Sequence, residues 1–137
     1  MPFRFPRVAC LLVGAPLLLV GCGGSPDAPI TGRADRFEQP WLQLGSQNLR
    51  VDTVVGDARP VRDANGIFRV SVPVRNVTDL ELHIDYTYTF TDENGTEVNR
   101  YPGVLHIPSR QTAEAVGNAS SPAATKFRLA LSYPRIN

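Results

Sequence analysis

Two histidines, His83 and His106, are the side chains of this 137-residue sequence that are best suited to chemistry. His83 and Asp85 alternate with apolar residues, so we expect both on one face of a strand, where they could form a weak metal site or an acid–base pair. His106 lies beside a predicted turn and has no partner that the sequence identifies. Polar pairs of this kind are common on hydrated strand faces, so we predict a solvated face with no metal ion, no cofactor and no catalytic residue.

Other polar patterns are equally weak as signs of catalysis. No serine lies in a nucleophile-elbow context, and no glycine-rich loop could bind a phosphate. Asp92 and Glu93 are adjacent carboxylates, but they fall in a predicted hairpin turn, where they stay hydrated. A row of threonines could offer a flat, hydrogen-bonding face to a partner or a glycan, although threonine is common on exposed strands anyway: Thr87, Thr89 and Thr91. We therefore predict that the protein is not an enzyme.

The amino-terminal segment is typical of a secretory signal. Arg4 and Arg7 precede residues 8–20, a run of 13 residues without a charge. A helix that crosses a bilayer needs about 20 such residues, whereas the apolar part of a cleavable signal is shorter. This length favours a signal peptide over a permanent membrane span.

The same segment ends in Leu19-Val20-Gly21-Cys22, which resembles the lipobox of bacterial lipoproteins. The resemblance implies cleavage after Gly21, so that residues 1–21 are the signal peptide, and acyl chains on Cys22, which would anchor the protein to a membrane. The thiolate of Cys22 is a soft nucleophile that suits this modification. By the sorting rule of two-membrane bacteria, the absence of Asp after Cys22 favours the inner leaflet of the outer membrane, facing the periplasm. The alternative is an ordinary secretory signal with an incidental cysteine.

Composition indicates one small domain behind a tether. Residues 22–40 are rich in Gly, Pro, Ser and Asp, which predicts a flexible lipidated tether, and residues 41–137 form the domain. The chain has 14 Lys+Arg and 13 Asp+Glu, so nothing indicates a nucleic-acid partner. Its arginines are scattered along the sequence, which we interpret as codon bias. Removal of Cys10 with the signal leaves one thiol, so the domain cannot form an internal disulfide.

Alternation of apolar and polar residues predicts an all-β domain. The longest alternating run, residues 80–91, places an apolar set on one face and a polar set on the other, as in an antiparallel sheet. Pro73 lacks an N–H, so its strand needs an edge or a bulge there. The expected strands are residues 49–53, 68–75, 80–91, 97–101, 104–107, 112–116 and 127–133. About seven short strands favour an immunoglobulin-like antiparallel β-sandwich, with a small open barrel as the alternative.

Part of this run also carries a family resemblance. Asn76-Val77-Thr78 and the pattern Tyr86-x-Tyr88-x-Phe90-x-Asp92-x-x-Gly95 resemble the YcfL-like family of small periplasmic lipoproteins. Residues 102–107 and 127–129 agree with it. The resemblance implies an immunoglobulin-like fold and a periplasmic location, and it implies no activity. Relatives often lie beside genes for a lipoprotein activator of peptidoglycan synthesis, which hints at partners in the cell wall.

Two hypotheses for function follow from an anchor, a tether and a β-sandwich without a catalytic set. The first is a non-catalytic, membrane-anchored module that contacts another envelope protein through a sheet edge or a loop, as an accessory to cell-wall synthesis. The second is a lipoprotein that binds a glycan, a peptide or a metal ion on a sheet face.

Overall fold

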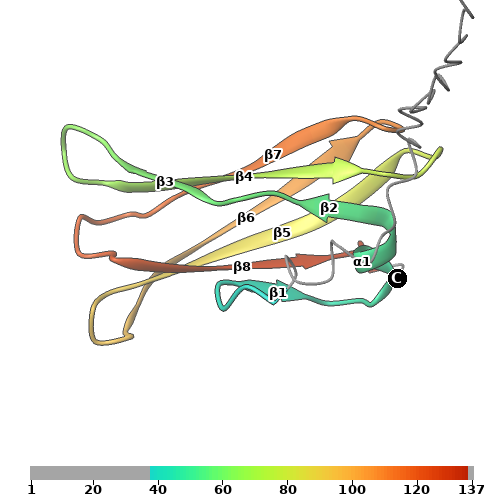
Figure 1. Ribbon diagram of the computed structural model, residues 1–137. Coiled ribbons are helices and arrows are strands. Elements are labelled where there is room, and N and C mark those ends of the chain that lie inside the picture. The colour runs from blue at the N-terminus through green and yellow to red at the C-terminus, as the bar shows by residue number, and fades with distance from the viewer. Residues whose placement is uncertain (1–37, 136–137) are drawn as a thin grey trace, which may run out of the picture.

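A computed structural model describes residues 38–135, and these residues form two stacked β-sheets with one short helix (Figure 1). The predicted signal peptide and lipobox, including Cys22, lie outside the described residues. The elements in chain order are β1 (Leu42–Leu44), α1 (Asn48–Asp52), β2 (Thr53–Val55), β3 (Arg59–Arg62), β4 (Phe68–Asn76), β5 (Leu82–Thr91), β6 (Glu97–Ile107), β7 (Thr112–Asn118) and β8 (Lys126–Ser132). The predicted all-β sandwich is confirmed, with eight strands where we expected about seven.

The first sheet, sheet A, has the strand order β1-β8-β5-β6. Its long hairpin β5–β6 follows the predicted alternation, because Ile84, Tyr88 and Phe90 are fully buried while His83 points to solvent. One pair departs from the predicted antiparallel arrangement, since β1 lies parallel to β8. A parallel pair needs a long connection. Here that connection is almost the whole domain, because β1 is the first strand of the chain and β8 is the last.

In the second sheet, sheet B, β4 is the central strand, with β7 on one side and β2 and β3 one after the other on the opposite side. Residues 56–58, between β3 and β2, lie beside Pro73, and the N–H of Gly56 donates to the Pro73 carbonyl at 2.8 Å. A β-carbon at Gly56 would come within 2.6 Å of the Pro73 ring. The strand beside β4 is therefore interrupted between β2 and β3, at the point where Pro73 has no N–H to donate. This interruption satisfies the expectation of an edge or a bulge at Pro73.

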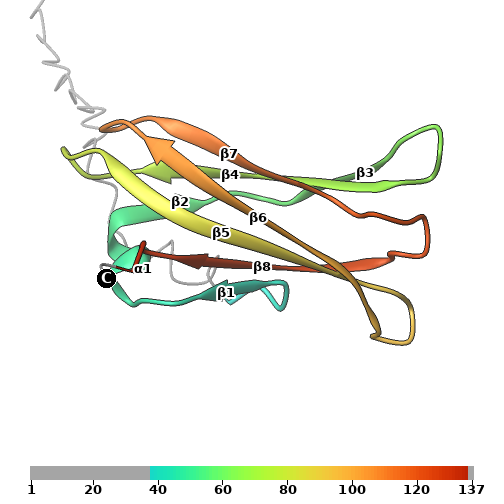
Figure 2. The same cartoon turned by 180° about the vertical axis from the view of Figure 1, so that it is seen from behind.

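Strand β6 corrects the prediction of a turn at Pro102-Gly103. The strand runs without a break from Glu97 to Ile107, along the margin of sheet A (Figure 2). Proline is tolerated there because β6 pairs only with β5 and has a free side. Glycine is needed because the Tyr86 ring lies directly over its backbone, where a β-carbon would be 2.3 Å from Tyr86 Cζ.

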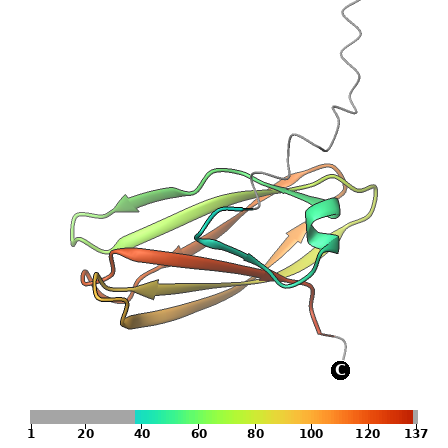
Figure 3. The same ribbon diagram turned by 60° about the horizontal axis from the view of Figure 1, so that its bottom comes forward.

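Two further predictions of local structure are wrong. Residues 49–53 were expected as a strand, but Asn48–Asp52 is a single helical turn that carries the chain from sheet A to sheet B (Figure 3). The alternation of apolar and polar residues in this segment suggested a strand, but Leu49 is buried while Val51 is 62% exposed, so the two do not share a buried face. Leu80 was expected on the apolar face of β5, but the strand begins at Leu82 and Leu80 is 75% exposed.

The core lies between the sheets and is closed by aromatic rings. Phe68 and Phe90 meet edge to face, and the Trp41 ring lies 5.6 Å from that of Phe127, so the tryptophan packs against the core. Tyr86 and Tyr88 cross from β5 to β7, where their hydroxyls donate to the carbonyls of Val116 and Ala115. No helix among residues 38–135 has the length and apolar character to cross a bilayer.

Asn76, at the end of β4, is the one polar side chain besides Thr53 that is buried within the described residues. Its Nδ2 donates to the carbonyls of Leu80, Ile107 and Pro108 at 2.6, 3.0 and 3.2 Å. Its Oδ1 accepts from the N–H and the hydroxyl of Thr78, both at 2.8 Å. Asn76 thus ties the β4–β5 loop to the end of β6.

Candidate functional site

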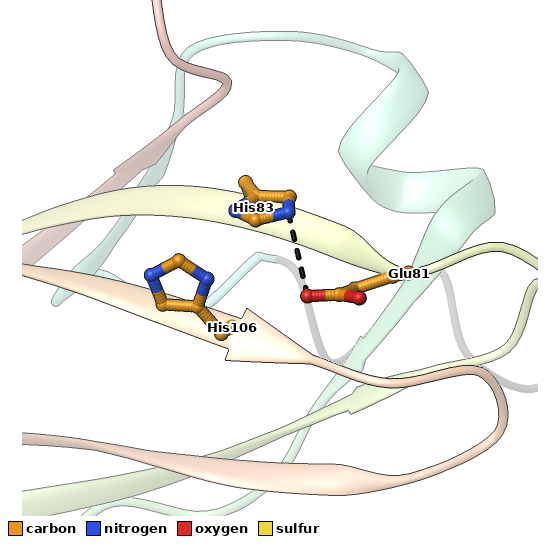
Figure 4. Close-up of side chains that lie close together, drawn as sticks. All are labelled: Glu81, His83 and His106. Atoms are coloured by element: carbon orange, nitrogen blue, oxygen red, sulfur yellow. Dashed lines mark ion pairs between the residues drawn. The ribbon is translucent and has the colours of Figure 1, made fainter.

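The most concentrated group of chemically capable side chains is the histidine cluster, which we define as Glu81, His83 and His106 (Figure 4). The imidazoles of His83 and His106 meet edge to face with centroids 4.5 Å apart. Glu81 Oε1 lies 3.4 Å from His83 Nε2. One potential ligand atom from each residue lies within 4.8 Å of the other two, and all three side chains are exposed.

Strand register and loop anchoring bring these three residues together. His83 on β5 is paired directly with His106 on β6, and residues paired in this way project from the same face of a sheet. Glu81 directly precedes β5, two residues before His83, so it follows the same alternation. The carbonyl of Leu80, the preceding residue, accepts from Asn76 Nδ2, which holds the loop that presents Glu81.

Both acidic and basic side chains lie around the histidine cluster. Asp79 is paired with Arg110 at 2.9 Å, and the hydrogen bond and charge of Arg110 lower the pKa of Asp79. Asp85 shares the outer face with His83, as predicted, but it lies outside the cluster and is paired with Val104, whose side chain is 53% exposed. The sequence-based pair of His83 and Asp85 therefore gives way to a cluster in which Glu81 and His106 are the neighbours.

His106 was missed as a partner because of the predicted turn at Pro102-Gly103. The hairpin turns at Asp92–Gly95, and its register shifts by one residue between Phe90 and Thr91, so that Asn99 lies opposite Phe90 and residue 106 lies opposite residue 83. The turn signal at Asp92–Gly95 was correctly interpreted, with Gly95 at a φ of 85°. A plain count along both strands from that turn would have placed Leu105 opposite His83, because the register shifts by one residue between Phe90 and Thr91. The pair therefore required both the continuation of β6 through a proline and this shift, and the sequence did not reveal the shift.

The other polar patterns have structural roles. Asp92 Oδ1 accepts the N–H groups of Asn94 and Thr96, so this carboxylate organises the turn, as expected for a turn aspartate. The row of Thr87, Thr89 and Thr91 occupies the middle of the outer face of sheet A, half-buried between the side chains of β6 and β8.

A second surface, the arginine face, is the outer side of sheet B around Arg59, Arg69 and Arg75. Arg69 and Arg75 project outward from β4 because the alternate residues of this strand are buried. Arg59 is in register with Ser71, so it lies on the same side. Its guanidinium pairs with Glu114 of β7 at 3.1 Å. Within residues 38–135, neither Arg69 nor Arg75 forms an ion pair, so this face has an excess of positive charge. Residues far apart in the sequence thus gather on one face.

Two of the edge strands, β3 and β6, are poorly suited to the addition of a partner strand. β3 carries Pro60 between charged residues, and β6 carries Pro102. Proline and charge at an edge both oppose strand addition, because they remove a backbone donor or must be desolvated. The uncovered sheet faces are therefore better candidates for contact than these two edges.

Comparison with known proteins places this sandwich in a family. A family described as "Protein of unknown function (DUF1425)" matches residues 42–133, which include all eight strands. The chain belongs to the DUF1425 family. No curated protein matches it in sequence. The YcfL-like resemblance is consistent with this membership.

Two solved structures share the fold of this DUF1425 chain. The crystal structure of Campylobacter jejuni cj0090 is 22% identical, with a TM-score of 0.56, and the match covers 70% of this chain and all of that one. The crystal structure of a DUF1425 family member from Shewanella sp. pv-4 is 17% identical, with a TM-score of 0.55, and the match covers 62% of this chain and 81% of that one. At these identities the likeness extends to the fold alone.

Proposed function

We propose that this DUF1425 protein is a lipid-anchored, non-catalytic module of the bacterial cell envelope that binds another envelope protein through its arginine face. The anchor is the acylated Cys22, and the domain faces the periplasm from the inner leaflet of the outer membrane. The observation that carries the proposal is the excess positive charge of an uncovered sheet face whose Arg69 and Arg75 form no ion pair among the described residues.

The charge of this face argues for an acidic protein surface as the partner. Glu114 offsets Arg59, which leaves the charges of Arg69 and Arg75 uncompensated. Arginine is enriched in protein interfaces because its planar group binds carboxylates in a bidentate manner. Val61, which is in register with Arg69 and 60% exposed, adds apolar area beside that charge. The outer face of sheet A lacks this bias, because it carries acidic residues beside its basic ones: Asp85 and Glu97 with Arg100, Lys126 and Arg128.

Site-specific photo-crosslinking in intact cells tests the contact. A photoreactive residue at position 71, at the centre of the arginine face, should give an adduct with one envelope protein, identifiable by mass spectrometry. The same residue at position 87, on the outer face of sheet A, is the matched control and should give much less of that adduct. Equal adducts at both positions, or none above background at position 71, would refute the proposed surface.

Charge reversal provides an independent test of the same contact. The double variant Arg69→Glu/Arg75→Glu should lose the adduct, whereas Arg128→Glu, an equally exposed arginine on sheet A, should keep it. Because exposed charges contribute little to stability, both variants should fold. The machinery of peptidoglycan synthesis is the first place to look for the partner, given the gene neighbourhood implied by the YcfL-like resemblance.

The anchor is tested separately at the amino terminus. Mass spectrometry of native protein should show a chain that begins at residue 22 and carries acyl chains. Cys22→Ser should abolish both the acylation and the cleavage after Gly21, while Cys10→Ser should change neither the mature mass nor the membrane association. A mature chain with an unmodified Cys22 would contradict the lipid anchor without affecting the proposed contact surface.

A further inference from the structure

We infer that Glu81, His83 and His106 form a surface site for a divalent transition-metal ion of the zinc class. The inference goes beyond the proposed protein contact, since the cluster lies on the opposite sheet from the arginine face. It also departs from the sequence-based expectation of no metal site, which rested on how often polar pairs occur on hydrated strand faces and was made without His106 as a neighbour of His83.

The donor set selects the class of ion. Two imidazole nitrogens and one carboxylate oxygen suit Zn²⁺ and its neighbours in the first transition row. Ca²⁺ and Mg²⁺ prefer sets made of oxygen atoms alone, so they are poor candidates for a site with two histidines. Asp85, the next acid along β5 on this face, is not part of the cluster, and the acid on the adjacent loop, Asp79, is already paired with Arg110.

The distances are close to those of a three-ligand site. Ligand atoms about 2.0–2.1 Å from a tetrahedral ion lie about 3.4 Å from one another. The separation of Glu81 Oε1 from His83 Nε2 is already 3.4 Å. The ligand atoms of all three residues lie within 4.8 Å of one another, so the longest gap must close by about 1.5 Å at most. Exposed side chains make such movements by rotation about their own bonds on short timescales.

The backbone of the site is more firmly held than its side chains. His83 and His106 are fixed by direct pairing of two long strands, and Ile84, Leu105 and Ile107 beside them are buried in the core. A rigid backbone under rotatable ligands needs no refolding to bind an ion. Three protein ligands leave the fourth position of a tetrahedral ion facing solvent, open to water or to a donor atom of another molecule.

Titration of the full-length chain, without a histidine tag and in detergent, tests the site with Zn²⁺ as the probe. Isothermal titration calorimetry should show one zinc ion bound per chain. His83→Ala and His106→Ala should each weaken binding by about tenfold or more. Glu81→Gln should also weaken it, whereas Glu97→Gln, an exposed carboxylate at the far end of the same hairpin, should leave it unchanged.

Cobalt substitution supplies a second readout that a structural role would not affect. Co²⁺ bound by imidazole and carboxylate absorbs visible light in a way that depends on its coordination number, and this absorption should disappear in the His83→Ala/His106→Ala variant. That variant keeps Cys10 and Cys22, so binding that survives in it would assign the metal to other residues. Surviving binding, or no zinc uptake by the native chain, would overturn the inference. The circular dichroism of the variant should match that of the native protein, because both histidines are exposed.

Discussion

Replacement of Asn76 tests whether one buried amide holds one end of the sandwich together. In Asn76→Ala the carbonyls of Leu80 and Pro108 keep second donors, from the Thr78 hydroxyl and the N–H of Gln111. The carbonyl of Ile107 loses its bond from Nδ2 in a buried position. A buried polar group left without its partner costs about 1–3 kcal/mol. Together with the lost bonds to Thr78 and the small cavity, we expect the free energy of unfolding to fall by about 3 kcal/mol.

Urea unfolding followed by the fluorescence of Trp41, the single tryptophan, measures this loss. The matched control is Asn94→Ala, in the exposed β5–β6 turn, which should change the free energy of unfolding by less than about 0.5 kcal/mol. Asn76→Asp distinguishes the loss of hydrogen-bond donation from the loss of side-chain volume. A carboxylate has nearly the same volume as the amide but cannot donate hydrogen bonds to the three carbonyls. It should therefore destabilise the fold at neutral pH at least as much as alanine. An Asn76→Asp protein as stable as the native one would refute the reasoning.

Three further predictions concern the tyrosines that cross to β7. Gly117→Ala should lower the free energy of unfolding by about 2 kcal/mol in urea titrations, because the new β-carbon would lie 2.4 Å from Cδ2 of the fully buried Tyr88. Gly103→Ala should also lower the free energy of unfolding, because the new β-carbon would collide with the Tyr86 ring. If each of the two glycine variants lost less than about 0.5 kcal/mol, the packing described would be contradicted. Burial raises the pKa of Tyr88 above its usual value of 10.0, so its stabilising effect is fully present below pH 10 and is lost at higher pH. Above pH 10 the unfolded chain releases a proton that the folded chain keeps, so stability should fall by about 1.4 kcal/mol per pH unit from this group, and Tyr88→Phe should show a correspondingly shallower fall in thermal melts between pH 10 and 12.

Side-chain periodicity was sufficient to predict most of the strands. In β4, the burial of Phe68, Val70, Val72 and Val74 follows the alternation seen in the sequence, as does that of β5 from Ile84 to Phe90. The period of two is a direct consequence of strand geometry, so it survives without knowledge of neighbours. Even the constraint at Pro73 was visible, because a missing N–H has to be accommodated in any sheet.

The features that could not be predicted depend on contacts between distant residues. Pro102-Gly103 has the composition of a turn, and only the position of the Tyr86 ring over Gly103 explains why the strand continues there. Leu49 alternates with its neighbours as a strand would, but a single buried leucine on one helical turn produces the same pattern. The histidine cluster was missed because a turn was predicted at Pro102-Gly103. The arginine face was missed because the strand register that brings Arg59 beside Ser71 is not visible in a linear sequence.

The parallel pairing of β1 with β8 has a consequence for when the domain can form. Leu42 is in register with Leu129, so the first strand waits for the last one before it has a backbone partner. Strand β5 likewise obtains its second neighbour only when β8 is present. For a domain that is exported behind a cleaved signal peptide, as proposed, residues emerge in chain order, so the sandwich cannot close until nearly all of it has emerged. Early segments would then remain extended during transit, and folding would follow as one late event.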